Sequence, residues 1–251
     1  LIKRTKSNIE LTSEGKIVFS YAEKIFSIVR DLESNLEDFN SLKAGKLKIG
    51  STPTLARYIL PDIIVSLKKR NPDLKVQLYT GLSKEVLGKV IDFEYHIGII
   101  GRVAYPGNII CKKISNPRLY LITSDDMNAS IPLKNLSNYP LLFPEQGSAT
   151  REYIINEFKK RSIPLNKYID CENPSALKHM VHLGTGGAFL PSYSIEKDVR
   201  EGKYKRIEIL DNLSMTIDLV YLKERKKSQP IKTFLNVIKG LAPPGVQANP
   251  D

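Results

Sequence analysis

The clearest hydrophobic pattern in the chain is a heptad repeat within residues 12–43. Its apolar positions are spaced alternately four and three residues apart, and they are Val18, Ala22, Ile25, Val29, Leu32, Leu36 and Phe39. This spacing predicts one helix of roughly 31 residues, about 46 Å long at 1.5 Å per residue. Thr12 is a suitable N-cap and Gly45 a suitable stop. Because the apolar seam is narrow, we expect the helix to pair with a partner helix; the alternative is that it packs on its own domain.

After Gly45, short apolar segments alternate with amphipathic ones. We expect strands at Lys46–Gly50, Lys75–Tyr79, His96–Ile100, Leu119–Thr123, Tyr139–Phe143, Tyr168–Cys171, Ala188–Leu190 and Thr216–Leu222. We expect helices at Thr54–Arg70, with a second segment starting at Pro61, and at Ser83–Ile91, Thr150–Arg161, Ser175–Leu183 and Gln229–Leu241. This alternation predicts an α/β fold. Two such units, joined by extended crossings near Leu119–Ser124 and Leu219–Lys223, predict two lobes that close around a small ligand.

The composition adds limits to this picture. The net charge is +11, from 38 basic and 27 acidic side chains. Because the basic residues are spread along the chain, apart from Lys3–Lys6 and Lys223–Lys227, the charge supports a DNA partner only weakly. No apolar run approaches the roughly 18 residues of a membrane span, and no secretion signal follows Leu1. We therefore expect a cytoplasmic protein with no membrane partner, in a chain that begins partway through a longer product.

The residues that carry catalysis or bind metals form no convincing cluster. Cys111 and Cys171 lie 60 residues apart without CxxC spacing, which favours two half-buried thiols over a disulfide, a zinc site or a redox pair. His179 and His182 share a predicted helix face but have no third ligand nearby. The glycine-rich run at 184–187 follows a helix, so we interpret it as a helix stop and not as a dinucleotide loop. We expect no enzyme activity, no metal and no cofactor.

Two segments have chemistry suited to a ligand. Residues 50–54 (GSTPT) and 145–151 (EQGSATR) each join a predicted strand to a predicted helix. Each places hydroxyl groups and unpaired backbone amides at a helix N-terminus, where the helix dipole favours an anion. Ordinary N-capping by serine or threonine explains either segment alone. Because the segments occupy corresponding places in the two lobes, we favour a shared ligand site, with Arg151 either contacting the ligand or forming an ion pair outside it.

Several motifs, in this order, resemble those of LysR-type transcription regulators. The stretch LIKR at 1–4, LTSEG at 11–15 and Tyr21-Ala22 is similar to the end of that family's winged helix-turn-helix and the start of its linker helix. The resemblance continues through GKLKIG at 45–50, Leu60-Pro61, NPD at 71–73 and Gly81. It extends through GSATR at 147–151, GTGG at 184–187, Leu190-Pro191 and the strand and helix at Ile217–Phe234. Ala149 stands where several relatives have glycine, which narrows the backbone approach.

The resemblance implies a type 2 periplasmic-binding-protein-like sensor of two Rossmann-like lobes, preceded by a linker helix. The implied divisions are 1–11 (end of the winged helix-turn-helix), 12–45 (dimerisation helix), 46–241 (effector-binding domain) and 242–251 (flexible tail). Lobe I would comprise 46–120 and 222–241, and lobe II 121–221. The implied ligand-binding residues are Ser51, Thr52, Pro53, Thr54, Ile100, Gly101, Gln146, Ser148, Thr150 and Arg151.

The function implied is a ligand-responsive transcription regulator. Its expected partners are a small, anionic effector, promoter DNA bound through an N-terminal head that precedes this chain, and further copies of itself as dimers and tetramers. The alternatives are a solute-binding protein of a transport system, which shares the two-lobe fold, and an enzyme on the same scaffold. The heptad helix disfavours the first, and the lack of a catalytic cluster disfavours the second.

Overall fold

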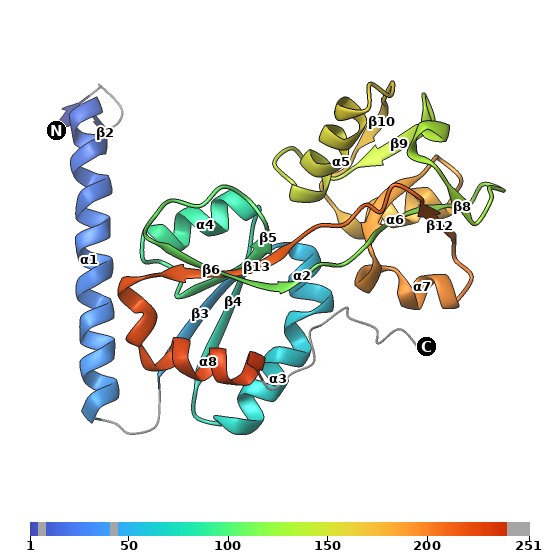
Figure 1. The fold of residues 1–251 in the computed structure, drawn as a ribbon. Helices are drawn as coiled ribbons and strands as arrows, with labels where there is room; N and C mark the ends of the chain where they lie inside the picture. Colours follow the sequence, from blue (N-terminus) through green and yellow to red (C-terminus); the bar gives the residue numbers. More distant parts are fainter. Residues whose placement is uncertain (5–8, 41–44, 240–251) are drawn as a thin grey trace.

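The computed structural model describes residues 1–4, 9–40 and 45–239, arranged as a long helix followed by two lobes (Figure 1). Strands β1 (Ile2–Arg4) and β2 (Ile9–Leu11) form an antiparallel pair before helix α1 (Ser13–Asn40). The amide of Gly15 donates to Thr12 Oγ1 at 3.0 Å, which confirms the expected N-cap. The expected helix end before Gly45 and the expected tail 242–251 lie outside the described residues.

The apolar seam of α1 is uncovered. Val18, Ile25 and Leu32 are 49%, 59% and 57% exposed. Other apolar side chains beside the seam are exposed too, namely Phe19, Tyr21, Phe26 and Ile28. The side chains of Leu36 and Phe39 lie outside the described residues. In the described part of the helix, the seam therefore does not pack on the chain's own domain.

Lobe I is a five-stranded sheet in the order β4-β3-β5-β13-β6. Its strands are β3 (Lys46–Ser51), β4 (Lys75–Thr80), β5 (Ile97–Gly101), β6 (Ile109–Ser115) and β13 (Ile217–Leu222). Helices α2 (Pro53–Tyr58), α3 (Leu60–Arg70) and α8 (Gln229–Lys239) pack on one face, and α4 (Ser83–Ile91) packs on the other. The expected second helical segment at Pro61 is confirmed, because α2 ends at Tyr58 and α3 begins at Leu60.

Lobe II contains a four-stranded sheet in the order β11-β7-β12-β8 and a parallel pair β10-β9, joined by a bridge between Leu141 and Gly187. The strands are β7 (Leu119–Thr123), β8 (Ser130–Ile131), β9 (Pro140–Phe143), β10 (Asn166–Asp170), β11 (Ala188–Pro191) and β12 (Lys205–Ile209). The helices are α5 (Ala149–Lys160), α6 (Pro174–His182) and α7 (Glu196–Arg200). Short 3-10 turns occur at η1 (Leu133–Leu136), η2 (Ser192–Ser194) and, in lobe I, η3 (Glu224–Lys227).

The chain crosses between the lobes twice, but not at the residues expected. Strand β13 pairs with β5 and β6 along its length, so residues 217–221 belong to lobe I and not to lobe II. Strand β7 pairs with β11 and β12, so it belongs to lobe II from Leu119 onward. The crossings are therefore residues 116–118 and 210–216. They run antiparallel, with the amide of Leu119 donating to Leu213 O at 2.8 Å and that of Met215 to Pro117 O at 3.2 Å.

Some elements have no counterpart in the expected pattern. Strand β6 lies at a sheet edge, carries consecutive exposed lysines (Lys112 and Lys113) and has a register shift against β13, so its apolar alternation is interrupted. Strand β12 and helix α7 are short segments of five residues each. These elements depend on neighbouring strands and helices more than on their own periodicity.

Candidate functional site

A narrow cavity of about 70 Å³ lies between the two lobes. Lobe I supplies the loops before α2 and α4 and the end of β5; lobe II supplies the β9–α5 loop, the start of α6, the end of β11 and the return crossing. The lining residues are Thr52, Pro53, Thr54, Leu55, Gly81, Leu82, Ser83, Gly101, Pro144, Glu145, Ser148, Ala149, Thr150, Pro174, Leu177, Leu190, Pro191, Tyr193 and Met215. Six of the ten expected ligand-binding residues line it, namely Thr52, Pro53, Thr54, Gly101, Ser148 and Thr150.

The other four expected residues lie elsewhere. Ser51 is fully buried, and its hydroxyl donates to the carbonyl of Ile99 at 2.8 Å. Ile100 is fully buried in the core between the sheet and α4, because successive strand residues face opposite sides of a sheet. Gln146 is exposed and does not line the cavity. Ser51 and Ile100 therefore belong to the interior of lobe I and do not line the cavity.

Arg151 forms an ion pair and does not face the cavity. Its guanidinium donates to both carboxylate oxygens of Asp170, at 2.6 and 3.1 Å, and to the carbonyl of Pro144 at 2.8 Å. The hydrogen bonds from Arg151 hold the pKa of Asp170 below its ordinary value. Of the two outcomes expected for Arg151, the structure has the ion pair, which ties the start of α5 to the end of β10.

The hydroxyl groups at the cavity are not used as helix caps. Thr52 precedes α2 and Ser148 precedes α5 in extended conformation, yet neither side chain bonds an amide of its helix. By contrast, Asn173 caps α6 by accepting from the amides of Ser175 and Ala176. Since the side chains of Thr52 and Ser148 do not cap their helices, the N-capping explanation for these two segments fails, and both residues line the space between the lobes.

Ser83 is a cavity residue that the sequence pattern did not single out. It is the first residue of α4, it is 1% exposed, and its hydroxyl has no hydrogen-bond partner among the described residues. A buried hydroxyl without a partner costs free energy. The same signal that selected Thr52 and Ser148, a hydroxyl residue where a strand leads into a helix, would have found it.

The cavity has no cationic side chain among its described lining residues, so only helix dipoles and hydrogen-bond donors counter the negative charge of Glu145 and favour an anion. Glu145 is the only charged side chain among the described lining residues. Helices α4 and α5 begin at the cavity, and the partial positive charge at their N-termini favours an anion. A tyrosine phenol is protonated at neutral pH in any case, and burial raises the pKa of Tyr193 further, so its hydroxyl can donate a hydrogen bond.

The lobes touch closely around the cavity. A methyl group added at Gly101, in lobe I, would meet the Cβ atom of Ala149, in lobe II, at 2.7 Å. One added at Gly147 would meet Cδ1 of Leu82 at 3.0 Å. The absence of side chains at these two glycines allows the closed arrangement.

The unpartnered hydroxyl of Ser83 leads to a stability prediction. Ser83→Ala is expected to raise the free energy of unfolding by about 1 kcal/mol, because it removes a buried polar group that lacks a hydrogen bond. This corresponds to a rise in Tm of about 2–4 °C for a chain of this size in calorimetry. Ser115→Ala is the matched comparison. That hydroxyl is also buried and unpartnered but lies outside the cavity, so a similar rise in Tm is expected. Loss of stability in Ser83→Ala alone would show that its hydroxyl is already bonded in the free protein.

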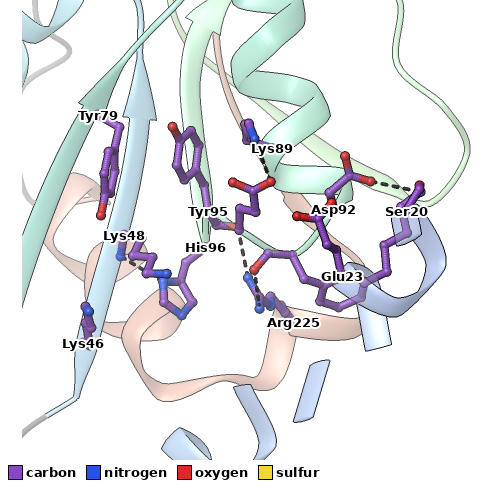
Figure 2. A pocket seen from close by; sticks show the side chains of 13 residues that line it. Ser20, Glu23, Lys46, Lys48, Tyr79, Lys89, Asp92, Tyr95, His96 and Arg225 are labelled. Carbon is purple, nitrogen blue, oxygen red and sulfur yellow. Dashed lines mark hydrogen bonds and ion pairs between the residues drawn. The ribbon is translucent and has the colours of Figure 1, made fainter. Parts of the chain in front are cut away.

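A second, larger cavity of about 600 Å³ lies between α1 and lobe I (Figure 2). The rings of Tyr79 and Tyr95 stack at its wall with centroids 5.0 Å apart. Many of its charged groups already have protein partners, including Lys24–Asp92 at 3.0 Å, Lys89–Glu94 at 2.7 Å, and Arg225, which donates to the carbonyls of Phe93 and Tyr95. Despite its size, we therefore place the candidate site in the smaller cleft, where the hydroxyl groups of Thr52 and Ser148 cap neither helix and that of Ser83 has no partner among the described residues.

The possible metal ligands, the two cysteines and the glycine-rich run were the other candidates from the sequence. No group of three or more potential metal ligands occurs among the described residues. Cys111 and Cys171 are free and half-buried. Gly184 adopts φ +82° after α6, and its amide donates to Val181 O, as expected for a helix stop. Among the described helices, none has both the length and the apolar character of a membrane span.

Comparisons with known proteins agree with this architecture. A probable RuBisCO transcriptional regulator of Phaeodactylum tricornutum is 24% identical over 260 residues, covering 96% of this chain and 82% of that protein. The effector binding domain of QuiR in complex with shikimate superposes with a TM-score of 0.70 at 18% identity, over 78% of this chain and 96% of that one. A full-length OxyR variant from Pseudomonas aeruginosa superposes with a TM-score of 0.74 at 19% identity, over 99% and 83% of the two chains.

These structural likenesses establish the two-lobed α/β fold. The family model of the LysR substrate binding domain matches residues 40–242, which is most of the chain. The resemblance expected from the sequence motifs is confirmed, and the chain belongs to the LysR substrate-binding domain family.

Proposed function

We propose that the cleft between the lobes binds a small anionic effector, and that this binding is the signal the protein senses. The chain is part of a ligand-responsive transcription regulator, since its family is the LysR substrate-binding domain and its curated relatives are transcription regulators. This assignment sets aside the alternative of a solute-binding protein for transport. The effector site itself, its chemistry and the assembly of the protein are the parts we propose.

The observation that carries the proposal is the pair of unused hydroxyl groups on opposite sides of the cleft. Thr52 of lobe I and Ser148 of lobe II stand at helix starts but cap neither helix. Ser83 adds a buried hydroxyl with no partner among the described residues. Donors from both lobes, together with the free amides at the start of α5, can surround one oxyanion or carboxylate.

The size of the cleft limits the ligand. A volume of about 70 Å³ is well below the roughly 300–1,000 Å³ of pockets that hold drug-sized ligands. The closed cleft therefore suits an inorganic oxyanion or a short carboxylate, and a larger effector requires the lobes to separate. The complex of the related QuiR domain with shikimate supports the use of this fold for binding small molecules.

The binding prediction concerns Thr52 and Ser148. The probes are sulfate, phosphate and short mono- and dicarboxylates, screened by thermal shift and measured by calorimetry. For the anion that stabilises the protein, the double variant Thr52→Ala, Ser148→Ala is expected to weaken affinity more than about 100-fold, since each charge-assisted hydrogen bond contributes about 1.5–3 kcal/mol.

The matched control is Ser66→Ala, Thr233→Ala, which removes the same two hydroxyl types from α3 and α8, away from the cleft. We expect this control to bind like the native protein. Unchanged affinity in the Thr52, Ser148 variant would place the anion elsewhere.

The assembly that we propose follows from the uncovered seam of α1. Exposed apolar side chains flank the seam, among them Phe19 and Phe26, so the apolar face is wider than that of a two-helix coiled coil. This width supports dimers through α1 that associate further into tetramers. In this proposal residues 1–11 are the end of a winged helix-turn-helix that binds promoter DNA, residues 12–45 are the linker helix, and the sensing domain runs from residue 46.

Coupling between effector and DNA needs an energetic link. An effector changes DNA binding only if lobe closure has a different free energy in different arrangements of the oligomer. The two crossing segments pair with each other and connect lobe I to lobe II. Closure about these segments changes the orientation of lobe II relative to lobe I within each subunit. This movement is the step that we propose transmits the signal.

A further inference from the structure

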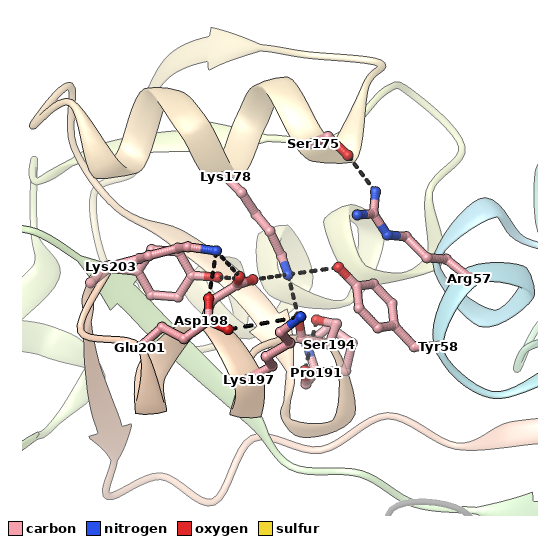
Figure 3. Close-up of polar contacts among 11 residues, drawn as sticks. Arg57, Tyr58, Ser175, Lys178, Pro191, Ser194, Lys197, Asp198, Glu201 and Lys203 are labelled. Carbon is pink, nitrogen blue, oxygen red and sulfur yellow. Dashed lines mark hydrogen bonds and ion pairs between the residues drawn. The ribbon is translucent and has the colours of Figure 1, made fainter.

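The two flanks of the cleft are held by polar contacts of different kinds. On one flank, α4 meets α5 through the ion pair Lys84–Glu152 at 3.3 Å, and these side chains are 66% and 46% exposed. On the other flank, α2 meets α6 and η2 through Tyr58 and Lys178 (Figure 3). The side chain of Lys178 is only 12% exposed. The flanks therefore differ in how far water screens their contacts.

Tyr58 is the lobe I side of the second contact. Its hydroxyl accepts a hydrogen bond from Lys178 Nζ at 3.0 Å, and the same ammonium group lies 4.8 Å from the centre of its ring. The guanidinium of Arg57 lies 5.4 Å from that ring, and it donates across the lobes to Ser175 Oγ at 2.6 Å. The aromatic ring of lobe I is thus contacted by one cation from each lobe.

Lys178 is fixed within lobe II before it reaches Tyr58. Its ammonium group donates to the carboxylate of Asp198 at 2.9 Å and also to the carbonyl of Ser194. Asp198 in turn accepts from Tyr204 at 2.7 Å and from Lys203 at 3.0 Å. Burial raises the pKa of Asp198, but the hydrogen bonds from Lys178, Tyr204 and Lys203 outweigh it and hold the pKa well below its ordinary value. Asp198 therefore remains a carboxylate that keeps Lys178 oriented toward Tyr58.

We propose that the Tyr58–Lys178 contact is a latch that keeps the two lobes closed, and that the cleft opens to solvent on the opposite flank, between α4 and α5. An exposed ion pair such as Lys84–Glu152 contributes little to closure and breaks at small cost. The partly buried ammonium group, in contrast, loses a hydrogen bond and an aromatic contact when the lobes part. The route by which an effector enters rests on the proposed function of the cleft, whereas the latch does not.

The test measures the distance between the lobes without any effector. Spin labels are attached at Lys69→Cys on α3 and Lys159→Cys on α5, both exposed, in a background with Cys111→Ser and Cys171→Ser. Labelled protein is diluted with unlabelled protein so that pulsed electron paramagnetic resonance reports distances within one subunit. Lys178→Met and Tyr58→Ala are expected to lengthen the mean distance by more than about 2 Å and to broaden its distribution.

Two control variants make the result specific. Lys203→Met removes a hydrogen bond to the same Asp198 carboxylate but contacts no lobe I residue among those described, and Lys84→Met removes the exposed ion pair on the other flank. Both are expected to keep the native distance. Tyr58→Phe, which keeps the ring and loses the hydroxyl, is expected to give a shift between the native protein and Tyr58→Ala.

Each outcome decides the proposal. Native distances in both Lys178→Met and Tyr58→Ala overturn the latch, and so does an equal lengthening in Lys203→Met. If Lys178→Met does not fold, the graded series from Tyr58→Phe to Tyr58→Ala decides alone. Because no effector is present, a failure of the latch is distinguishable from a failure of anion binding, which the sulfate, phosphate and carboxylate titrations measure separately.

Discussion

Replacing Ile25 by aspartate is expected to dissociate the protein into monomers. Ile25 lies in the middle of the α1 seam and is 59% exposed in the single chain. Pairing of two helices would bury this side chain in both copies, with about 1.5–3 kcal/mol gained for each isoleucine. Aspartate removes this gain and places two like charges close together. The combined loss of about 3–6 kcal/mol weakens dimerisation at least about 100-fold.

Light scattering coupled to size-exclusion chromatography, with analytical ultracentrifugation over a concentration series, measures this effect. Ser20→Asp is the control, because Ser20 is exposed on the same helix but lines the cavity toward lobe I and not the apolar seam. It introduces the same charge and is expected to leave the oligomer intact. A native mass distribution for Ile25→Asp would mean that α1 is not the dimer interface, and thermal unfolding of lobes I and II should be unchanged in either variant.

Gly101→Ala is expected to prevent full closure of the cleft and to weaken anion binding by a factor of at least about 10. The added methyl group would lie 2.7 Å from Cβ of Ala149 and 3.0 Å from Cε of Met215. Ala149 is anchored on α5 and is not a flexible chain end, so the lobes must separate to relieve the contact. Hydroxyl groups from both lobes then no longer reach one ligand together, and a loss of one good hydrogen bond corresponds to about tenfold in affinity.

Gly88→Ala is the matched control for this variant. Gly88 lies within α4, and a methyl group added there meets nothing within 4 Å. Alanine in a helix interior stabilises by about 0.5–1 kcal/mol relative to glycine, so Gly88→Ala is expected to raise Tm slightly and bind anions normally. Calorimetry with the anion identified by the thermal-shift screen compares the two variants. Native affinity in Gly101→Ala would show that lobe closure at this point does not contribute to binding.

The elements that were predicted well carry strong local signals. Helix α4 and strand β7 have the bounds expected from the sequence, because each combines a clear period with boundary residues of the right type. The start of α1 at Thr12 was found for the same reason. Strand β6 was missed because its pattern is interrupted at Lys112 and Lys113, and it exists as a strand through its pairing with β13.

The candidate site was predicted in part, and the division has a physical basis. Thr52 and Ser148 lie between a strand end and a helix, and Thr150 lies in the first turn of α5; in an α/β lobe such residues gather at one edge of the sheet. The prediction that Ile100 lines the cleft was wrong. Side-chain direction alternates along a strand, so the neighbour of the cleft residue Gly101 faces the core. Arg151 was undecided because its partner, Asp170, lies 19 residues away on another strand.

What the sequence determined by itself is most of the helices and strands, the two-lobe organisation, the apolar seam of α1 and the family. These depend on periodicity, on helix boundary residues and on ordered motifs, all of which are local along the chain. The tertiary structure alone decided where the chain crosses between the lobes, which hydroxyl groups remain without a cap, and which side chains join one lobe to the other. These features depend on contacts between residues far apart in sequence, such as Tyr58 with Lys178 and Gly101 with Ala149, and no local pattern records such contacts.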